Sequence, residues 1–168
     1  MQNVATGEVV NSLQTDTPNT EFLQGMAIFP DGKRLATAST AAPVVKVWDL
    51  ATGRKLVELR GHNLVLLRIV VSPDGQRLAT STIGQEPIKI WDSASWEETA
   101  SLEVPGAFVV AAAFLPDGNT LVGGEWGPRG GVLHFWQAPS WDEIKAVEAK
   151  EPPSPGDGGQ GKAEIKQP

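Results

Sequence analysis

Short apolar runs alternate with polar turns along most of this chain, and the same order of runs occurs three times. Each copy begins with an apolar run that is continuous rather than alternating, which predicts a strand buried on both faces. A Pro-Asp-Gly turn follows, then a strand of small residues, and then a strand that ends in tryptophan. The three copies begin near residues 26, 67 and 110.

The copies are evenly spaced, because the turn aspartates Asp31, Asp74 and Asp117 lie 43 residues apart. A fixed period of about 40–45 residues is typical of a β-propeller built from four-stranded blades. In each turn, proline presets φ, glycine supplies a positive φ, and we expect the aspartate to accept hydrogen bonds from backbone amides. The pattern predicts an all-β fold with about three four-stranded antiparallel blades.

The predicted organisation has three parts. Residues 1–25 are expected to hold the outer-strand remnant of a preceding repeat and a loop, and residues 26–149 the three blades. Residues 150–168 are rich in proline and glycine and almost lack apolar side chains that could offset the entropy of ordering, which predicts a disordered tail. Charged outer strands are expected to end the blades, at residues 55–60, 98–103 and 143–148.

Charge and cysteine usage narrow the range of functions. The chain has 14 Lys and Arg against 20 Asp and Glu, and its net charge of −6 argues against nucleic acid or an anionic membrane as the main partner. It has no cysteine, which excludes disulfides and thiolate chemistry. No apolar run approaches the roughly 20 residues of a membrane helix, and the start of the chain lacks a signal-peptide pattern. A cytoplasmic location is therefore expected.

Three motifs in register give the chain a resemblance to the WD-repeat family of β-propellers. They are Gly61-His62 before an apolar strand, the Ser-Pro-Asp-Gly turn around Asp74, and the Ile-Lys-Ile-Trp-Asp strand around Trp91. Trp48 and Trp136 occupy the position of Trp91 in the other copies. The resemblance implies blades of four antiparallel strands and a rigid platform for partner proteins, seldom an enzyme.

The resemblance also implies a buried hydrogen-bonded set in complete repeats. Its members are a histidine before the inner strand, a serine or threonine on the second strand, an aspartate in the next loop, and the tryptophan. His62, Thr82 and Trp91 match three of these positions. Gly84 or its neighbours stand where the aspartate belongs, so the set is expected to be incomplete.

Catalytic and metal sites are not expected. His62 is interpreted as structural, and His134 is expected at a solvent-facing position of its strand. Two scattered histidines without cysteine argue against a zinc site. No nucleophile elbow, phosphate-binding glycine loop or paired-carboxylate motif is present. The first copy is expected to pair Trp48 with Ser39. We therefore predict no catalytic residue, no metal and no cofactor.

Loops in which the copies differ are the candidate partner-binding sites. The resemblance implies that partners bind the face that these loops form. Trp126 and Arg129 lie in the longest of them, and these residue types dominate the binding energy at interfaces. The alternative is that Trp126 packs over the end of its blade as local core. The candidate residues are Asn63, Gln85, Glu86, Trp126 and Arg129.

Three blades would form an incomplete ring with two open apolar flanks, which should not stay in water. Either the chain is the terminal part of a longer ring, or several copies associate to close one by cyclic symmetry. The first functional hypothesis is a non-enzymatic scaffold for protein–protein interaction. The alternative is a regulatory or sensory module of a larger multidomain protein. A propeller hydrolase is a distant third, because the sequence supplies no convergent set of acids and histidines.

Overall fold

The computed structural model describes residues 12, 22–84, 86–103, 108–127 and 130–139, and these residues form strands joined by turns and loops. The strands are β1 (Leu23–Ile28), β2 (Arg34–Ser39), β3 (Val44–Asp49), β4 (Lys55–Arg60), β5 (Leu66–Val71), β6 (Arg77–Thr82), β7 (Ile88–Asp92), β8 (Glu98–Leu102), β9 (Phe108–Phe114), β10 (Thr120–Gly127) and β11 (Gly130–Gln137). Within these residues there is no helix of the length and apolarity needed to cross a membrane.

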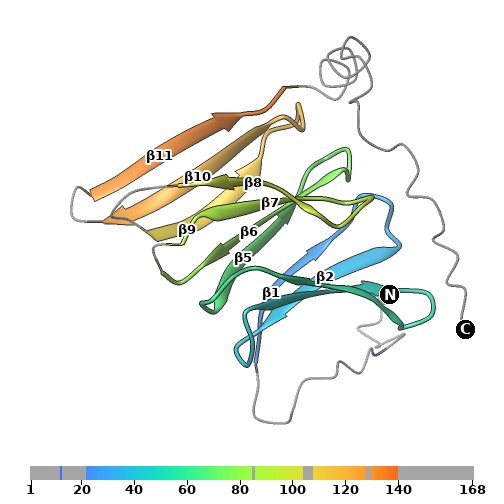
Figure 1. The fold of residues 1–168 in the computed structure, drawn as a ribbon. Helices are drawn as coiled ribbons and strands as arrows, with labels where there is room; N and C mark the ends of the chain where they lie inside the picture. The colour runs from blue at the N-terminus through green and yellow to red at the C-terminus, as the bar shows by residue number, and fades with distance from the viewer. Residues whose placement is uncertain (1–11, 13–21, 85, 104–107, 128–129, 140–168) are drawn as a thin grey trace, which may run out of the picture. The chain divides into compact units, whose positions relative to one another are not determined.

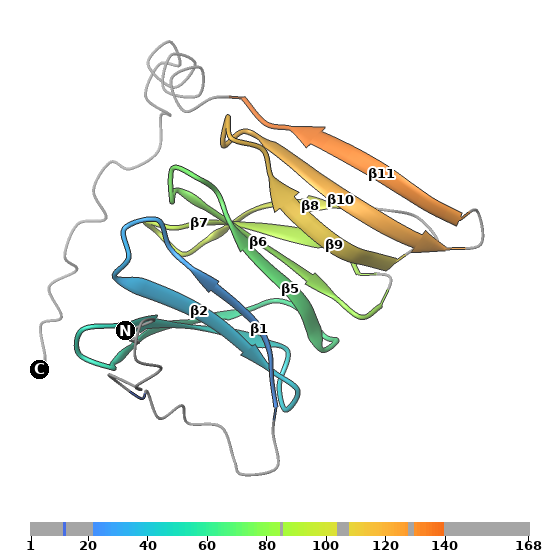
Figure 2. The same ribbon diagram turned by 180° about the vertical axis from the view of Figure 1, so that it is seen from behind.

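The strands form three antiparallel sheets in which each strand pairs with the next one along the chain. Sheet I contains β1–β4, sheet II contains β5–β8, and sheet III contains β9–β11. Sheet II lies between the other two, since β5 contacts both β1 and β9. Figures 1 and 2 show this order from opposite sides, with sheet II in green and sheet III in yellow to orange. The predicted all-β, antiparallel arrangement is confirmed for these residues.

Tight turns join the first two strands of each sheet, as the sequence predicts. The glycine of each Pro-Asp-Gly turn has a φ between 66° and 72°, a conformation that other residues rarely adopt. Asp31, Asp74 and Asp117 each accept a hydrogen bond from the amide two residues later, at 2.8, 3.0 and 2.9 Å. The role of these aspartates as turn formers is therefore confirmed.

Each sheet has two faces that pack differently. We call the face that carries the third-strand tryptophan the tryptophan face, and the other the aliphatic face. Cross-strand pairing and alternation place Val71, Leu78 and Trp91 on the tryptophan face of sheet II. Val70, Ala79 and Ile90 lie on its aliphatic face by the same pairing.

Two apolar layers hold the sheets together. In the first, the tryptophan face of sheet II packs against Ala36, Val45 and Val47 of sheet I. In the second, the tryptophan face of sheet III, with Leu121 and Trp136, packs against the aliphatic face of sheet II. Sheet II is therefore covered on both sides, and all six residues of β6 are buried.

Polar contacts connect the same pairs of sheets. Arg34 Nη1 donates to the carbonyl of Ser93 at 3.2 Å, which joins sheets I and II. Arg77 Nη1 donates to the carbonyl of Gly118 at 3.1 Å and to Asn119 Oδ1 at 2.7 Å, which joins sheets II and III. These hydrogen bonds fix how neighbouring turns sit against one another.

One sequence-based expectation about the inner strands was wrong. Strand β1 is not buried on both faces, because Met26 and Ile28 on its tryptophan-face side are exposed. Strand β9 is likewise open on its aliphatic-face side, where Ala111 and Ala113 are exposed. The continuous apolar runs are present in the sequence, but within the described residues no sheet covers these two sides. The predicted outer strands at residues 8–13 and 143–148 and the tail at 150–168 fall outside the described residues, apart from Ser12.

Buried Leu78 gives a direct test of the packing. Leu78→Ala is expected to lower the free energy of unfolding by about 2–5 kcal/mol, because the side chain is fully buried between sheets I and II. The matched variant Leu56→Ala removes a half-exposed side chain of β4 and should cost less than about 1 kcal/mol. Urea denaturation of both variants measures the difference, and equal losses would contradict this packing.

Candidate interaction surface

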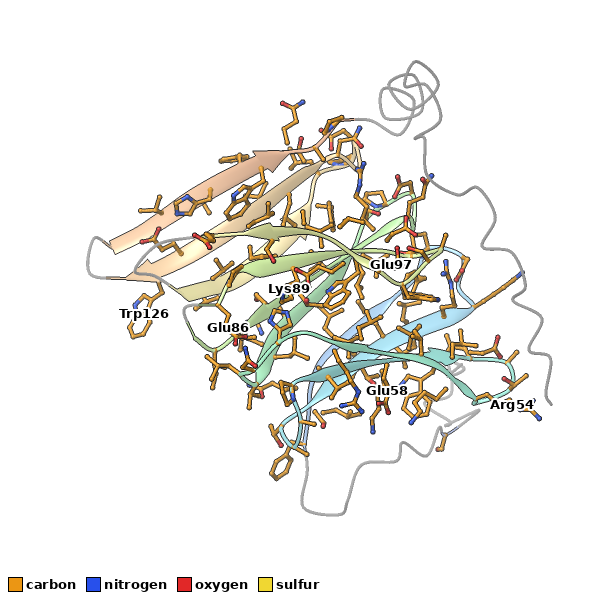
Figure 3. All side chains as sticks on the ribbon, in the orientation of Figure 1. Arg54, Glu58, Glu86, Lys89, Glu97 and Trp126 are labelled. Atoms are coloured by element: carbon orange, nitrogen blue, oxygen red, sulfur yellow. The ribbon has the colours of Figure 1, made fainter. Side chains whose placement is uncertain are left out.

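The three sheets present their loops at one end and their Pro-Asp-Gly turns at the other. A Cβ built at Gly75 would lie 3.3 Å from Pro30, and one at Gly118 would lie 3.4 Å from Asp74, so turns of neighbouring sheets touch. Since successive antiparallel strands reverse direction, the β2–β3, β6–β7 and β10–β11 connections all lie at the opposite end, which we call the loop end. Figure 3 shows Glu86 and Trp126 toward this end.

A buried hydrogen-bond chain runs from the loop end into sheet II. Trp91 Nε1 donates to Thr80 Oγ1 at 2.9 Å, and Thr80 Oγ1 lies 2.8 Å from His62 Nε2. His62 Nδ1 lies 3.1 Å from Glu86 Oε2. The expected set around His62 and Trp91 is therefore present, but its other two members differ from the sequence-based assignment.

Two assignments for this set were wrong. Thr80 takes the threonine position, whereas Thr82 is buried elsewhere and accepts only a long hydrogen bond, 3.4 Å, from the amide of Gly84. Glu86 takes the aspartate position, so the set is complete rather than incomplete. Sequence inspection for an aspartate near Gly84 missed it, because a glutamate two residues farther on reaches the same histidine.

Glu86 indicates which ring nitrogen of His62 carries the proton. Its ionised carboxylate can only accept, so the proton belongs on Nδ1, and Nε2 is left to accept from the Thr80 hydroxyl. His62 Nδ1–H can then donate to the Glu86 carboxylate, which leaves every member with a partner. Burial lowers the pKa of His62, although the hydrogen bond and the charge of Glu86 oppose that shift. His62 is thus buried, and its lowered pKa favours the neutral form near pH 7.

Glu86 also holds the backbone at the loop end. Its carboxylate accepts hydrogen bonds from the amide of Asn63 at 2.9 Å and from that of Leu64 at 3.4 Å. Burial acts to raise the pKa of Glu86, but the hydrogen bonds from Asn63, His62 and Leu64 outweigh it and lower the pKa. The ionised carboxylate therefore connects two loops of sheet II to its core.

Within the described residues, the other sheets contain only parts of this hydrogen-bonded set. In sheet I, Trp48 Nε1 donates to Thr37 Oγ1 at 2.8 Å, so the pairing of Trp48 with Ser39 was wrong by two residues. In sheet III, Gly123 stands at the position of Thr37 and Thr80. The ring of Trp136 fills the space that a side chain would need, since a Cβ at Gly123 would lie 2.7 Å from it.

Sheet III has a polar pair of its own. His134 Nε2 bonds to the carboxylate of Glu125, and that carboxylate is almost wholly buried while His134 is one-third exposed. The His134 ring also stacks on Trp136, with centroids 5.6 Å apart. His134 is therefore not the solvent-facing residue that the sequence suggested. In the part of the chain that the structure describes, no three His, Cys, Asp or Glu side chains gather to hold a metal ion.

Large apolar side chains are exposed at the loop end in all three sheets. Trp126 extends from the β10–β11 hairpin, where it pairs with Gly131, and is 66% exposed. The alternative that Trp126 packs as local core is therefore wrong. Three further residues that the sequence analysis missed share this end and are 41–75% exposed: Phe22, Leu64 and Ile83.

Backbone hydrogen bonds place these residues at the loop end. Phe22 exchanges bonds with Thr40, which follows β2, and the amide of Ile83 donates to the carbonyl of Val65 at 3.0 Å. Sequence reasoning missed Phe22 and Leu64 because each belongs to a short apolar run, and it missed Ile83 because a single apolar residue beside a turn gives no pattern. Only the ends of the strands show that these residues face water. Gln85 and Arg129, the other predicted partner-binding residues, lie outside the described residues.

Comparison with known proteins supports the fold and leaves the function open. No protein-family model matches the sequence. No curated protein matches it either. Among solved structures 910 chains match, so the fold recurs widely and does not itself identify a function. One is a chain of hydrazine synthase from Kuenenia stuttgartiensis, with a TM-score of 0.67 and 20% identity over 79% of this chain. The present chain covers 38% of that protein, and at this identity the likeness concerns the fold alone.

Thr80 and Thr82 give a matched test of the buried chain. Thr80→Val should lower the free energy of unfolding by about 1–3 kcal/mol, because Trp91 and His62 both lose a buried partner. Thr82→Val should cost less than about 1 kcal/mol, because it removes only a long hydrogen bond. Chemical denaturation of the two variants checks this, and a larger loss for Thr82→Val would contradict the assignment.

Buried His62 predicts that stability falls in mild acid. Its folded pKa lies below the usual 6.5, so the unfolded chain binds the proton first. The stabilisation is complete above about pH 6.5 and is lost as the pH falls through the folded pKa. The measurement is the free energy of unfolding across this range.

His62→Gln should lack this loss and retain only the one that ionised carboxylates such as Glu86 cause below about pH 4.5. His134→Gln is the matched control and should keep the His62 step. If the free energy of unfolding depended on pH in the same way for His62→Gln and the wild type above about pH 4.5, the buried neutral state of His62 would be refuted.

Proposed function

We propose that this chain is a WD-repeat β-propeller segment that acts as a non-enzymatic scaffold and binds a partner protein at its loop end. The observation that carries the proposal is the exposure of Phe22, Leu64, Ile83 and Trp126 at one end of three adjacent sheets. Single exposed apolar residues are ordinary, whereas several at one end of a protein are typical of an interaction site.

The chemistry of this end suits a protein partner. Trp126 offers a large rigid ring with only two side-chain torsions to immobilise, and such residues contribute most to interface energy. Leu64 and Ile83 add aliphatic surface at the same end, and Asn63 is exposed next to Leu64. Acidic residues outnumber basic ones by six over the whole chain, which is unfavourable for a nucleic-acid backbone.

The second candidate is a regulatory or sensory module of a larger multidomain protein. The observation that favours it is that a similar fold occurs within a longer chain, of which the present chain covers 38%. In that case the loop end would contact another part of the same polypeptide, and any catalysis would lie elsewhere. The two candidates use the same surface and differ in where the partner comes from.

Substitution at the loop end tests the scaffold proposal. The immobilised protein captures binding partners from an extract, and quantitative mass spectrometry compares the amounts. Trp126→Ala and Leu64→Ala should each reduce capture of the specific partner by about 30-fold, the factor that corresponds to losing a binding hot spot.

Leu115→Ala is the matched control for Leu64→Ala. Leu115 is similarly exposed but adjoins the Pro-Asp-Gly turn of sheet III, at the other end of the sheets. This variant should capture the partner as the wild type does. Equal capture by all three variants would eliminate the loop end as the binding surface.

A further inference from the structure

Neighbouring sheets pack in one consistent direction. At both internal interfaces, the tryptophan face of the later sheet covers the aliphatic face of the earlier one. The positions correspond through the repeat, so that Ile69, Leu78 and Trp91 in sheet II match Ala112, Leu121 and Trp136 in sheet III. The chain thus contains two examples of the same interface.

Two faces have no neighbouring sheet within the described residues: the aliphatic face of sheet III and the tryptophan face of sheet I. We call them the end faces, and each corresponds to one side of the internal interface. On the aliphatic face of sheet III, Leu133 and Phe135 are 65% and 63% exposed. The corresponding residues of sheet I, Val45 and Val47, are at most 1% exposed, because sheet II covers them. The exposed aliphatic face of sheet III is therefore apolar like the aliphatic faces of sheets I and II, and each of those is covered by the next sheet.

The other end face carries the complementary half. That face is open along its β1 edge, where Met26 and Ile28 are 63% and 64% exposed, although Ile69, which matches Met26, is 5% exposed at the first internal interface. Trp48 and Thr37, farther across the same face, are 2% and 3% exposed, so the free surface is the β1 side. The Pro-Asp-Gly turns also show that sheet I has no neighbour on this side within the described residues. Gly75 and Gly118 touch the turn of the preceding sheet, whereas a Cβ at Gly32 would meet nothing within 4 Å.

We propose that copies of this chain associate head to tail, with the aliphatic face of sheet III packed on the β1 side of sheet I in a second copy. The partner is a second copy because the internal interfaces already show which face fits this one. The surface is distinct from the loop end, so the inference does not depend on the proposed scaffold function. Such a contact is heterologous, which allows copies to close into a ring.

The internal interface also predicts one specific contact. A Cβ at Gly25 would lie 3.4 Å from Ile69 across the interface between sheets I and II. Through the repeat, Gly25 corresponds to Ala111 and Ile69 corresponds to Met26. Ala111 of one copy is therefore expected to face Met26 of the next.

Complementation between two charge variants tests the proposal. Phe135→Glu blocks one end face and Met26→Glu blocks the other, and each should weaken association at least about 30-fold. Light scattering coupled to size exclusion should show the wild type assembled and each variant monomeric. An equimolar mixture should form a dimer, because each variant retains the intact face that the other lacks.

Circular dichroism and the unfolding midpoint of each variant establish that it remains folded, since both positions are exposed in the monomer. Gln76→Glu, in an exposed turn of sheet II and away from both end faces, adds the same charge as a control and should assemble as the wild type does. Monomeric wild type at every concentration would overturn the proposal. So would assembly of Met26→Glu alone, which would mean that the sheet III faces pair with each other.

Cysteine cross-linking tests the register without relying on affinity, since the chain has no cysteine of its own. Ala111→Cys mixed with Met26→Cys and oxidised should give a disulfide-linked pair in high yield. Ala111→Cys mixed with Gln76→Cys, in an exposed turn, should give little. Equal yields in the two mixtures would refute the head-to-tail register.

Discussion

Packing of a tryptophan face on an aliphatic face is the interaction on which the described structure depends. A sheet must bury its apolar face against another element, so each of these sheets needs a neighbour. Sheet II meets this need on both sides, which is why all of β6 is buried. Arg34 and Arg77 add hydrogen bonds across the same two interfaces. The apolar layers supply the free energy, and these directional bonds set the alignment of the sheets.

The set of hydrogen bonds around the third-strand tryptophan is largest in sheet II, smaller in sheet I and replaced by apolar packing in sheet III. Sheet II has the full chain from Trp91 to Glu86, sheet I has the Trp48–Thr37 bond, and sheet III has Gly123 with the Trp136 ring filling the site. A buried polar chain requires every member to have a partner, because a buried donor left alone costs about 1–3 kcal/mol. Replacing threonine by glycine lets the ring pack closely. Sheet III therefore relies on apolar packing at the position where sheet II uses hydrogen bonds.

The repeated pattern was sufficient to predict the strands of the described residues, their turns and their order in each sheet, because these depend on local residue chemistry with a period of 43. The turn aspartates and their glycines needed nothing more than the motif. The hydrogen-bond partners of His62 could not be predicted from the motif alone, because they depend on strand register and side-chain length. Thr80 rather than Thr82 faces Trp91 because of the exact cross-strand register, in which Leu78 pairs with Trp91. Glu86 and the Glu125–His134 pair depend on how far a longer side chain and an extended hairpin reach, which a one-dimensional pattern does not contain.

Glu86 has a consequence for how the loop end would meet a ligand. The same carboxylate that bonds to buried His62 also holds the amides of Asn63 and Leu64. The backbone beneath Leu64 is thus ordered before any encounter, and little conformational entropy remains to be lost when a ligand arrives. If a partner binds at this end as proposed, its contact with Leu64 would be closer to lock and key than to folding upon binding, with selectivity set by the shape of the bound molecule.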